Sequence, residues 1–147
     1  MIDGYPIVLN LAQRPVLVVG GGRIAARKIN QLVQAHASVT VVSPTLAETI
    51  DVTQVTWWNR PYQPADLTGF QLIFAATNDG ALNQAIVDAA ASDQWVNNVS
   101  DHDTSDFFNV AQIKTPEYLV TVSTLGHSPR AAKQLKQRLA KWLRTEG

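Results

Sequence analysis

The six residues 20–25, Gly-Gly-Gly-Arg-Ile-Ala, restrict the fold of this chain more than any other segment. They follow directly on the apolar run Val-Leu-Val-Val at residues 16–19, and an uninterrupted run of this kind is typical of a strand buried on both faces. After the glycines, apolar residues recur at helical spacing, at Ala25, Ile29, Leu32 and Val33. A strand, a glycine turn and an amphipathic helix therefore follow one another without a break, as in the first half of a β-α-β unit.

The spacing of this turn, G-x-G-x-x-A, predicts a dinucleotide-binding site. Gly20 would form the tight turn, Gly22 would let the backbone approach a pyrophosphate, and Ala25 would let the helix pack closely on the strand. The helix N-terminus would supply unpaired N–H donors and a positive dipole. The alternative, a glycine-rich turn without a ligand, stays open.

One part of the dinucleotide fingerprint is missing. An Asp or Glu after the second strand usually holds the ribose 2′-hydroxyl of NAD, whereas this chain has Ser43, Pro44 and Thr45 there. Ser43 or Thr45 could hydrogen-bond a ribose, but neither would repel a 2′-phosphate as a carboxylate does. The residues alone therefore leave NAD and NADP both open, and we expect a modest preference for NAD.

Strand and helix patterns alternate through the first two thirds of the chain, which favours a parallel sheet. Four more strands are expected, at residues 39–42, 55–58, 72–76 and 95–98, and a second helix at 81–92. The pattern then changes to a hairpin at 107–122 and a long helix from Ser128. We expect an α/β fold, a Rossmann-like NAD-binding parallel sheet with a C-terminal β-hairpin and helix extension.

This change divides the chain into two expected parts. Residues 1–106 would form the NAD-binding domain, and residues 107–147 a dimerisation hairpin with the C-terminal basic helix. A lone hairpin leaves strand edges exposed, and pairing across a two-fold axis covers them. We therefore expect a homodimer.

The C-terminal helix carries six of the twelve cations of the chain, namely Arg130, Lys133, Lys136, Arg138, Lys141 and Arg144. Ser128 is a good N-cap residue and Pro129 suits the first helical position. Either the basic face is simply solvated, or its first turn faces the ligand cleft and attracts a polyanionic substrate.

Polar residues follow the fourth and fifth strands, where ligands of open α/β sheets bind. Thr77 and Asn78 could contact the cofactor, or they could cap the helix that starts near Ala81. After the fifth strand, Asp101 could act as a general base in a partly dry cleft.

The alternative for Asp101 is an Asp-rich turn with Asp103 and Asp106. A metal site that includes His102 is a third possibility, but adjacent Asp and His residues lack the spacing of a preformed cage, so no metal is expected.

The composition is that of one globular unit and excludes several classes of protein. The chain has 147 residues, 46% apolar and 16% charged. Twelve cations balance twelve anions, which argues against nucleic-acid binding, and the absence of cysteine excludes disulfides and thiolate chemistry. There is no apolar run of about 18 residues and no signal-peptide pattern, so we expect a cytoplasmic protein without membrane attachment.

Six segments together make the chain resemble the precorrin-2 dehydrogenase / sirohydrochlorin ferrochelatase family, the N-terminal part of siroheme synthase. They are Y-P-I near the N-terminus, VVGGGRIAARK, TVVSP, IFAATND, NNVSD and VSTLGHSPRAAKQL. The likeness extends from about residue 5 to residue 144. It implies NAD-dependent oxidation of precorrin-2 to sirohydrochlorin, and in many members insertion of Fe²⁺, as a second substrate, to give siroheme.

The resemblance also implies roles for individual residues. Asp101 matches the catalytic aspartate of the family, Gly22, Arg23 and Ile24 match the pyrophosphate turn, and Ser43, Pro44 and Thr45 match the adenosine-ribose segment. A tetrapyrrole with eight carboxylates would favour basic residues, for which the candidates are Arg27, Lys133 and Arg130. Two other functions stay open: a non-catalytic NAD(H)-binding regulatory module, and a tetrapyrrole- or metal-handling relative that has lost dehydrogenation.

Overall fold

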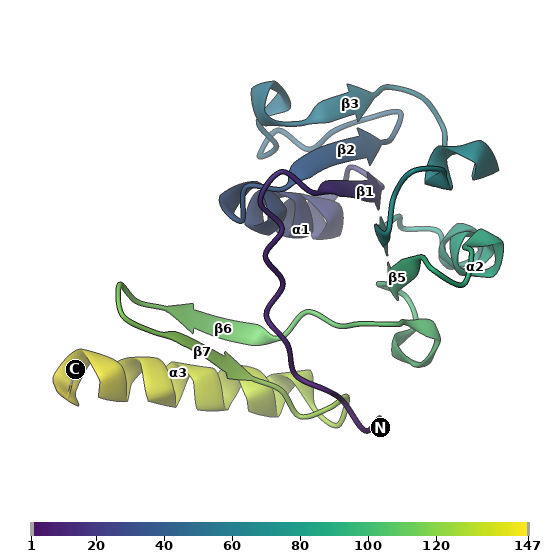
Figure 1. Cartoon of the computed structure of the whole chain (residues 1–147). Coiled ribbons are helices and arrows are strands. Elements are labelled where there is room, and N and C mark those ends of the chain that lie inside the picture. Colours follow the sequence, from purple (N-terminus) through teal and green to yellow (C-terminus); the bar gives the residue numbers. More distant parts are fainter. Residues whose placement is uncertain (1, 147) are drawn as a thin grey trace. The chain divides into compact units, whose positions relative to one another are not determined.

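The computed structural model describes residues 2–146, which form two compact units (Figure 1). Residues 8–107 form the first, here called the sheet unit. The described residues before position 8 and after position 107 form the second, here called the hairpin unit.

The sheet unit holds five parallel strands in the order β3-β2-β1-β4-β5. These are β1 (Pro15–Val19), β2 (Ser38–Val42), β3 (Thr56–Trp58), β4 (Leu72–Ala75) and β5 (Trp95–Asn98). The helices α1 (Arg23–Gln34) and α2 (Gly80–Ala89) connect β1 to β2 and β4 to β5. The strand order reverses between β1 and β4, and ligands of open α/β sheets bind where the order reverses, beyond the carboxyl ends of the strands.

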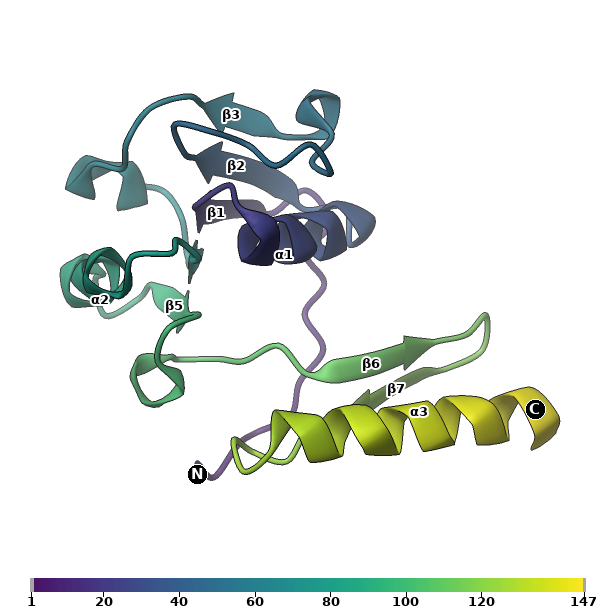
Figure 2. The same ribbon diagram turned by 180° about the vertical axis from the view of Figure 1, so that it is seen from behind.

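The sheet is covered on both faces, as the apolar run of β1 predicts. Val16 and Val18 face one apolar cluster together with Ile29 of α1. Leu17 and Val19 face the other, in which α2 takes part. All four β1 side chains from Val16 to Val19 are at most 1% exposed. In Figure 2, α1 lies in front of β1.

The hairpin unit contains an antiparallel pair, β6 (Ala111–Lys114) and β7 (Leu119–Val122), and the helix α3 (Pro129–Glu146), which packs against both strands. Thr115 closes the turn, because its Oγ1 accepts a hydrogen bond of 2.9 Å from the Tyr118 N–H. The unit has little core of its own: among its described apolar side chains only Val122 and Ala132 are buried.

The structure confirms the α/β fold with its hairpin and long helix, and corrects some boundaries. The second helix ends at Ala89 instead of residue 92, because Ala90 is extended (φ −69°, ψ 142°). The side chain of Gln94 holds the following turn by accepting from the Ala91 N–H and donating to Leu67 and Phe70 carbonyls. Within residues 2–146, no helix has the length and hydrophobicity that crossing a membrane would require.

Candidate cofactor and active site

The glycine turn is built by close backbone approach at its first two positions. Gly20 has a φ of +121°, and a Cβ there would lie 2.3 Å from the carbonyl oxygen of Ala76. A Cβ on Gly21 would lie 2.1 Å from the carbonyl oxygen of Thr45. Neither position can hold a larger residue, so the ends of β1, β2 and β4 meet closely around this turn.

The third glycine has open space in front of it. Within residues 2–146, a Cβ on Gly22 would meet nothing within 4 Å, and no side chain caps α1 at its N-cap residue Gly22. The side chains of Arg23 and Ile24 in the first helical turn are exposed. Ala25, by contrast, is fully buried against the sheet. An uncapped, approachable helix N-terminus of this kind fits a pyrophosphate group.

The segment after β2 lies at the same edge of the sheet. Ser43 is buried; its carbonyl accepts a 2.8 Å hydrogen bond from the Trp57 indole, and its Oγ accepts one of 3.4 Å from the Thr45 N–H. Pro44 and Thr45 are exposed. Thus Pro44 and Thr45 are accessible to a ligand, whereas the Ser43 side chain is buried and hydrogen-bonded within the turn.

Thr77 and Asn78 differ in their surroundings. The Thr77 hydroxyl donates to Asn83 Oδ1 at 2.7 Å and accepts from the Asp79 N–H at 3.1 Å, whereas Asn78 is exposed. The capping alternative was wrong for both residues, because the cap of α2 is Asp79, whose Oδ1 accepts from the N–H groups of Ala81 and Leu82. Thr77 nevertheless stabilises the turn after β4 through its hydrogen bonds to Asn83.

Asp101 lies three residues beyond the end of β5, half-buried, at the carboxyl edge of the sheet. Its Oδ1 accepts a hydrogen bond of 2.9 Å from the Asp103 N–H and so caps the short helical turn His102–Thr104. The expected turn therefore exists for Asp101 and Asp103, but Asp106 lies outside it. A carboxylate has two oxygens, so this cap does not prevent Asp101 from also accepting a proton.

The residues after this turn fold back along the open edge of β5. The Asp106 N–H donates to the Val96 carbonyl, and Asp106 Oδ2 accepts from the Val96 N–H, both at 2.8 Å. Asp106 thus continues the sheet, while Asp103 is exposed. Across residues 2–146, no three His, Asp or Glu side chains form a group able to hold a metal ion.

The three candidate substrate cations lie in different units. Arg27 is exposed on α1 of the sheet unit, whereas Arg130 and Lys133 are exposed on α3 of the hairpin unit. A common site for all three stays a prediction.

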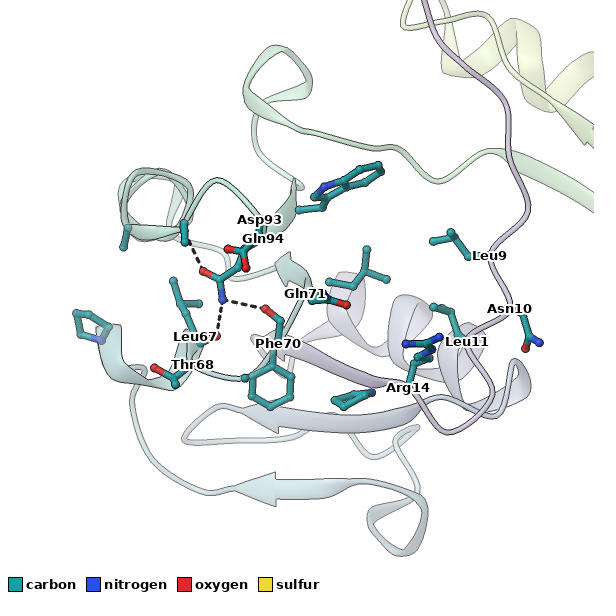
Figure 3. A pocket seen from close by; sticks show the side chains of 17 residues that line it. Leu9, Asn10, Leu11, Arg14, Leu67, Thr68, Phe70, Gln71, Asp93 and Gln94 are labelled. Carbon is teal, nitrogen blue, oxygen red and sulfur yellow. Dashed lines mark hydrogen bonds between the residues drawn. The ribbon is translucent and has the colours of Figure 1, made fainter.

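The large cavity in Figure 3, about 930 Å³, lies elsewhere in the sheet unit. Pro15, Leu72 and Trp95 line it, and these residues begin β1, β4 and β5. The cavity is therefore at the amino edge of the sheet, opposite the glycine turn, and takes no part in the candidate cofactor site.

Known proteins match both the sequence and this geometry. The family described as "Putative NAD(P)-binding" matches residues 7–111. A solved structure of SirC, precorrin-2 dehydrogenase, superimposes with a TM-score of 0.85 at 34% identity, over 94% of this chain and 70% of that one. The chain belongs to the NAD(P)-binding family of siroheme synthase N-terminal domains and SirC-type precorrin-2 dehydrogenases.

Longer proteins of this family match nearly the whole of this chain. The siroheme synthase of Methylococcus capsulatus is 39% identical over 143 residues, which are 94% of this chain and 30% of that protein. Siroheme synthase 1 of Pectobacterium atrosepticum is 38% identical over 139 residues, 91% of this chain and 29% of that protein. The chain thus spans less than a third of these siroheme synthases.

Two residues that shape the site were missed by the sequence analysis. Gly21 lets the backbone that follows β2 pass close to the glycine turn. The Ala47 N–H donates a 2.7 Å hydrogen bond to the Gly21 carbonyl there. Asn83 on α2 is fully buried. The sequence feature that could have identified Asn83 is a polar amide on a helix that also contains Ala, Leu and Ile. Its hydrogen-bond partners are distant in sequence, however, and no periodicity identifies them.

Proposed function

We propose that this chain is an NAD-dependent precorrin-2 dehydrogenase that produces sirohydrochlorin in siroheme synthesis. The observation that carries this proposal is the open, uncapped α1 N-terminus at Gly22, at the same sheet edge as Asp101. The likeness to SirC, precorrin-2 dehydrogenase, supports the choice of substrate.

The cofactor would be held mainly by backbone groups of the sheet unit. Gly20 permits the tight turn, Gly22 leaves room for close approach, and the N–H groups of Arg23 and Ile24 would face the pyrophosphate. Ser43, Pro44 and Thr45 would border the adenosine ribose, and Thr77 and Asn78 would border the cofactor at the end of β4. When bound, NAD⁺ supplies the hydride acceptor. Since the segment after β2 has no carboxylate, the preference over NADP should be modest.

Asp101 would take the proton that the reaction releases. Oxidation of precorrin-2 to sirohydrochlorin removes one hydride and one proton, and the hydride carries both electrons. The Asp103 N–H fixes Oδ1 of Asp101 in the turn, so we assign the proton to Oδ2. A base on a fixed carboxyl group needs no reorganisation before it accepts the proton.

The substrate would be recognised by its carboxylates. Arg27 on α1, and Arg130 and Lys133 on α3, are exposed cations that such a polyanion would attract. The hairpin unit has few buried apolar residues while Tyr118 and Trp142 are 64% and 58% exposed, which supports pairing of residues 107–147 with a second copy of the chain.

A second candidate function is compatible with the same geometry. Asp101 makes a structural cap, which it would make equally in a non-catalytic NAD(H)-binding module. A relative that handles tetrapyrrole or metal, with Fe²⁺ as its substrate, is the other alternative.

Incubation of the pure protein with precorrin-2 and NAD⁺ distinguishes these functions. We expect NADH absorbance and the sirohydrochlorin spectrum to appear together in a one-to-one ratio. NAD⁺ binding without turnover would support the non-catalytic module. Adding Fe²⁺ and sirohydrochlorin without NAD⁺ tests metal insertion separately, because siroheme has its own spectrum.

A further inference from the structure

Lys28 occupies an unusual position on α1, between the helix and the sheet. Its side chain is half-buried, and its Nζ lies over the ring of Phe74 in β4, 5.5 Å from the ring centroid. Phe74 in turn contacts the ring of Phe107 edge-on, with centroids 5.2 Å apart and an interplanar angle of 89°. The Lys28 ammonium thus has a cation–π contact with Phe74, whose ring packs against Phe107.

The Lys28 ammonium has no anionic partner among the described residues. Among residues 2–146, no carboxylate lies within ion-pair distance of it, and burial alone lowers its pKa below the usual value. A partly desolvated charge without a counterion costs free energy, and the contact with one aromatic ring offsets only part of that cost. Such a residue is a candidate for binding a ligand charge.

A second polar group beside the same rings also lacks a partner. Asn97 of β5 is the register partner of Phe74, and its Nδ2 donates to the Phe107 carbonyl at 2.9 Å. Its Oδ1 is buried and no described residue donates a hydrogen bond to it; Asn97 is only 5% exposed. An acceptor without a donor and a cation without an anion therefore both adjoin the Phe74–Phe107 pair, and the described residues do not complete this polar site.

The direction of the Lys28 side chain places this site toward the cofactor edge. Side chains of a helix lean toward its N-terminus, so Lys28 leans toward the glycine turn at Gly22. Phe74 lies one residue before the end of β4, and Thr77 lies two residues beyond that end. The same sheet edge carries Asp101 after β5.

We propose that Lys28 is a positioning residue that binds a carboxylate of a polyanionic tetrapyrrole and so orients the ring system at the cofactor edge. The proposal rests on the proposed function. It adds a residue to the site, because Arg27 beside it is exposed, whereas Lys28 is half-buried and its ammonium lies over the ring of Phe74.

Lys28→Met tests this directly, because methionine keeps a similar length and can still pack on Phe74. The matched control is Arg14→Met, which removes one exposed cation at the amino edge of the sheet. We expect Lys28→Met to raise the KM for precorrin-2 about tenfold with kcat and the Kd of NAD⁺ within twofold, and Lys28→Arg to restore most of the loss. Arg14→Met should keep a wild-type KM.

A binding measurement separates this proposal from the dehydrogenase activity. The octacarboxylate uroporphyrin cannot be oxidised in this reaction, and its fluorescence reports binding to the full chain. Its Kd should rise about tenfold in Lys28→Met and stay within twofold in Arg14→Met, with both variants melting at or above the wild-type Tm.

The outcomes distinguish failure of the two proposals. If wild type oxidises precorrin-2 and Lys28→Met has an unchanged KM, the role of Lys28 is refuted and the dehydrogenase stands. If wild type does not turn over but binds uroporphyrin in a Lys28-dependent way, the role of Lys28 stands and the dehydrogenase fails. Uroporphyrin binding that is equal in all variants overturns the role of Lys28.

Discussion

Asn83 and Ser100 join the ends of two structural elements beside the cofactor edge: Asn83 Nδ2 donates a 2.7 Å hydrogen bond to Ser100 Oγ. The same nitrogen donates to the Thr77 carbonyl at 3.1 Å, and Asn83 Oδ1 accepts from the Thr77 N–H at 3.1 Å. A fully buried amide in α2 thus connects the segments that follow β4 and β5. Because these segments carry Thr77 and Asp101, the geometry of the site depends on a residue that touches no ligand.

Replacing Asn83 by alanine should therefore destabilise the fold. The change removes the acceptor of the Thr77 N–H and the donor to the Thr77 carbonyl and to Ser100 Oγ, and we expect a loss of about 2–3 kcal/mol in the free energy of unfolding. Urea denaturation followed by tryptophan fluorescence measures it. The control is Gln84→Ala on the same helix. Gln84 Nε2 donates to the exposed Asp88, so this change should alter stability by less than about 0.5 kcal/mol. Equal effects of the two changes would contradict the connecting role of Asn83.

Gly22→Val should abolish NAD⁺ binding in a folded protein. The Gly22 backbone has a φ of −84°, which valine adopts, and the new side chain would occupy the open space in front of α1. Calorimetry should show NAD⁺ affinity reduced by at least about a hundredfold, with stability lowered by about 1 kcal/mol or less. Gly20→Ala provides the contrast: its φ of +121° and the nearby Ala76 carbonyl predict a loss of fold stability. Wild-type NAD⁺ affinity in folded Gly22→Val would refute the phosphate-turn assignment.

Asp101→Asn should preserve the structure and slow the reaction. The asparagine Oδ1 can still accept from the Asp103 N–H, so the turn should remain while the basic oxygen is lost. We expect turnover of precorrin-2 to fall by ~10²–10⁴-fold with unchanged NAD⁺ binding. Asp103→Asn, on an exposed side chain, is the control and should have far less effect. An Asp101→Asn rate equal to wild type would end the general-base proposal.

Acid should weaken the sheet unit through Asp66. Its carboxylate is buried and accepts from Arg60 at 2.7 and 2.9 Å, and this pairing holds the pKa of Asp66 below its usual value. Since the folded pKa is lowered, the stabilisation is fully present above the unfolded value of about 3.9 and is lost as the pH falls through the folded pKa. The stability difference between wild type and Asp66→Asn should be constant above about pH 5 and shrink below about pH 4, as urea midpoints at successive pH values would show. A difference independent of pH would argue against this ion pair as its source.

The hairpin unit should make the intact protein a dimer. Leu119 on β7 is 45% exposed and lies next to Tyr118 in the turn, on the side of the hairpin opposite the buried Val122. Light scattering at micromolar concentration should give twice the chain mass, and Leu119→Asp should shift the protein toward the monomer with the helical circular dichroism unchanged. A monomeric wild type would contradict the dimerisation role of residues 107–147.

The sequence by itself determined the strand–turn–helix unit around Gly20 and Gly22 and, with it, the parallel sheet. These features follow from local rules: an apolar run of four residues needs burial on both faces, and a glycine turn before a helix leaves N–H groups unpaired. Its motifs also indicated the family that the comparisons then confirmed. No pattern of this kind exists for contacts between residues far apart in the chain.

The tertiary structure decided the side-chain environments. Ser100 is seventeen residues from Asn83, so no local rule shows that the amide of Asn83 connects two strand ends. The same holds for Lys28, whose place over Phe74 depends on how α1 packs on β4. Asp101 was recognised as a candidate from its motif, but its cap on the Asp103 N–H appeared only in three dimensions. Local periodicity specifies which face of an element is buried, whereas the partner of each buried polar group is set by the packing of elements that the chain brings together from a distance.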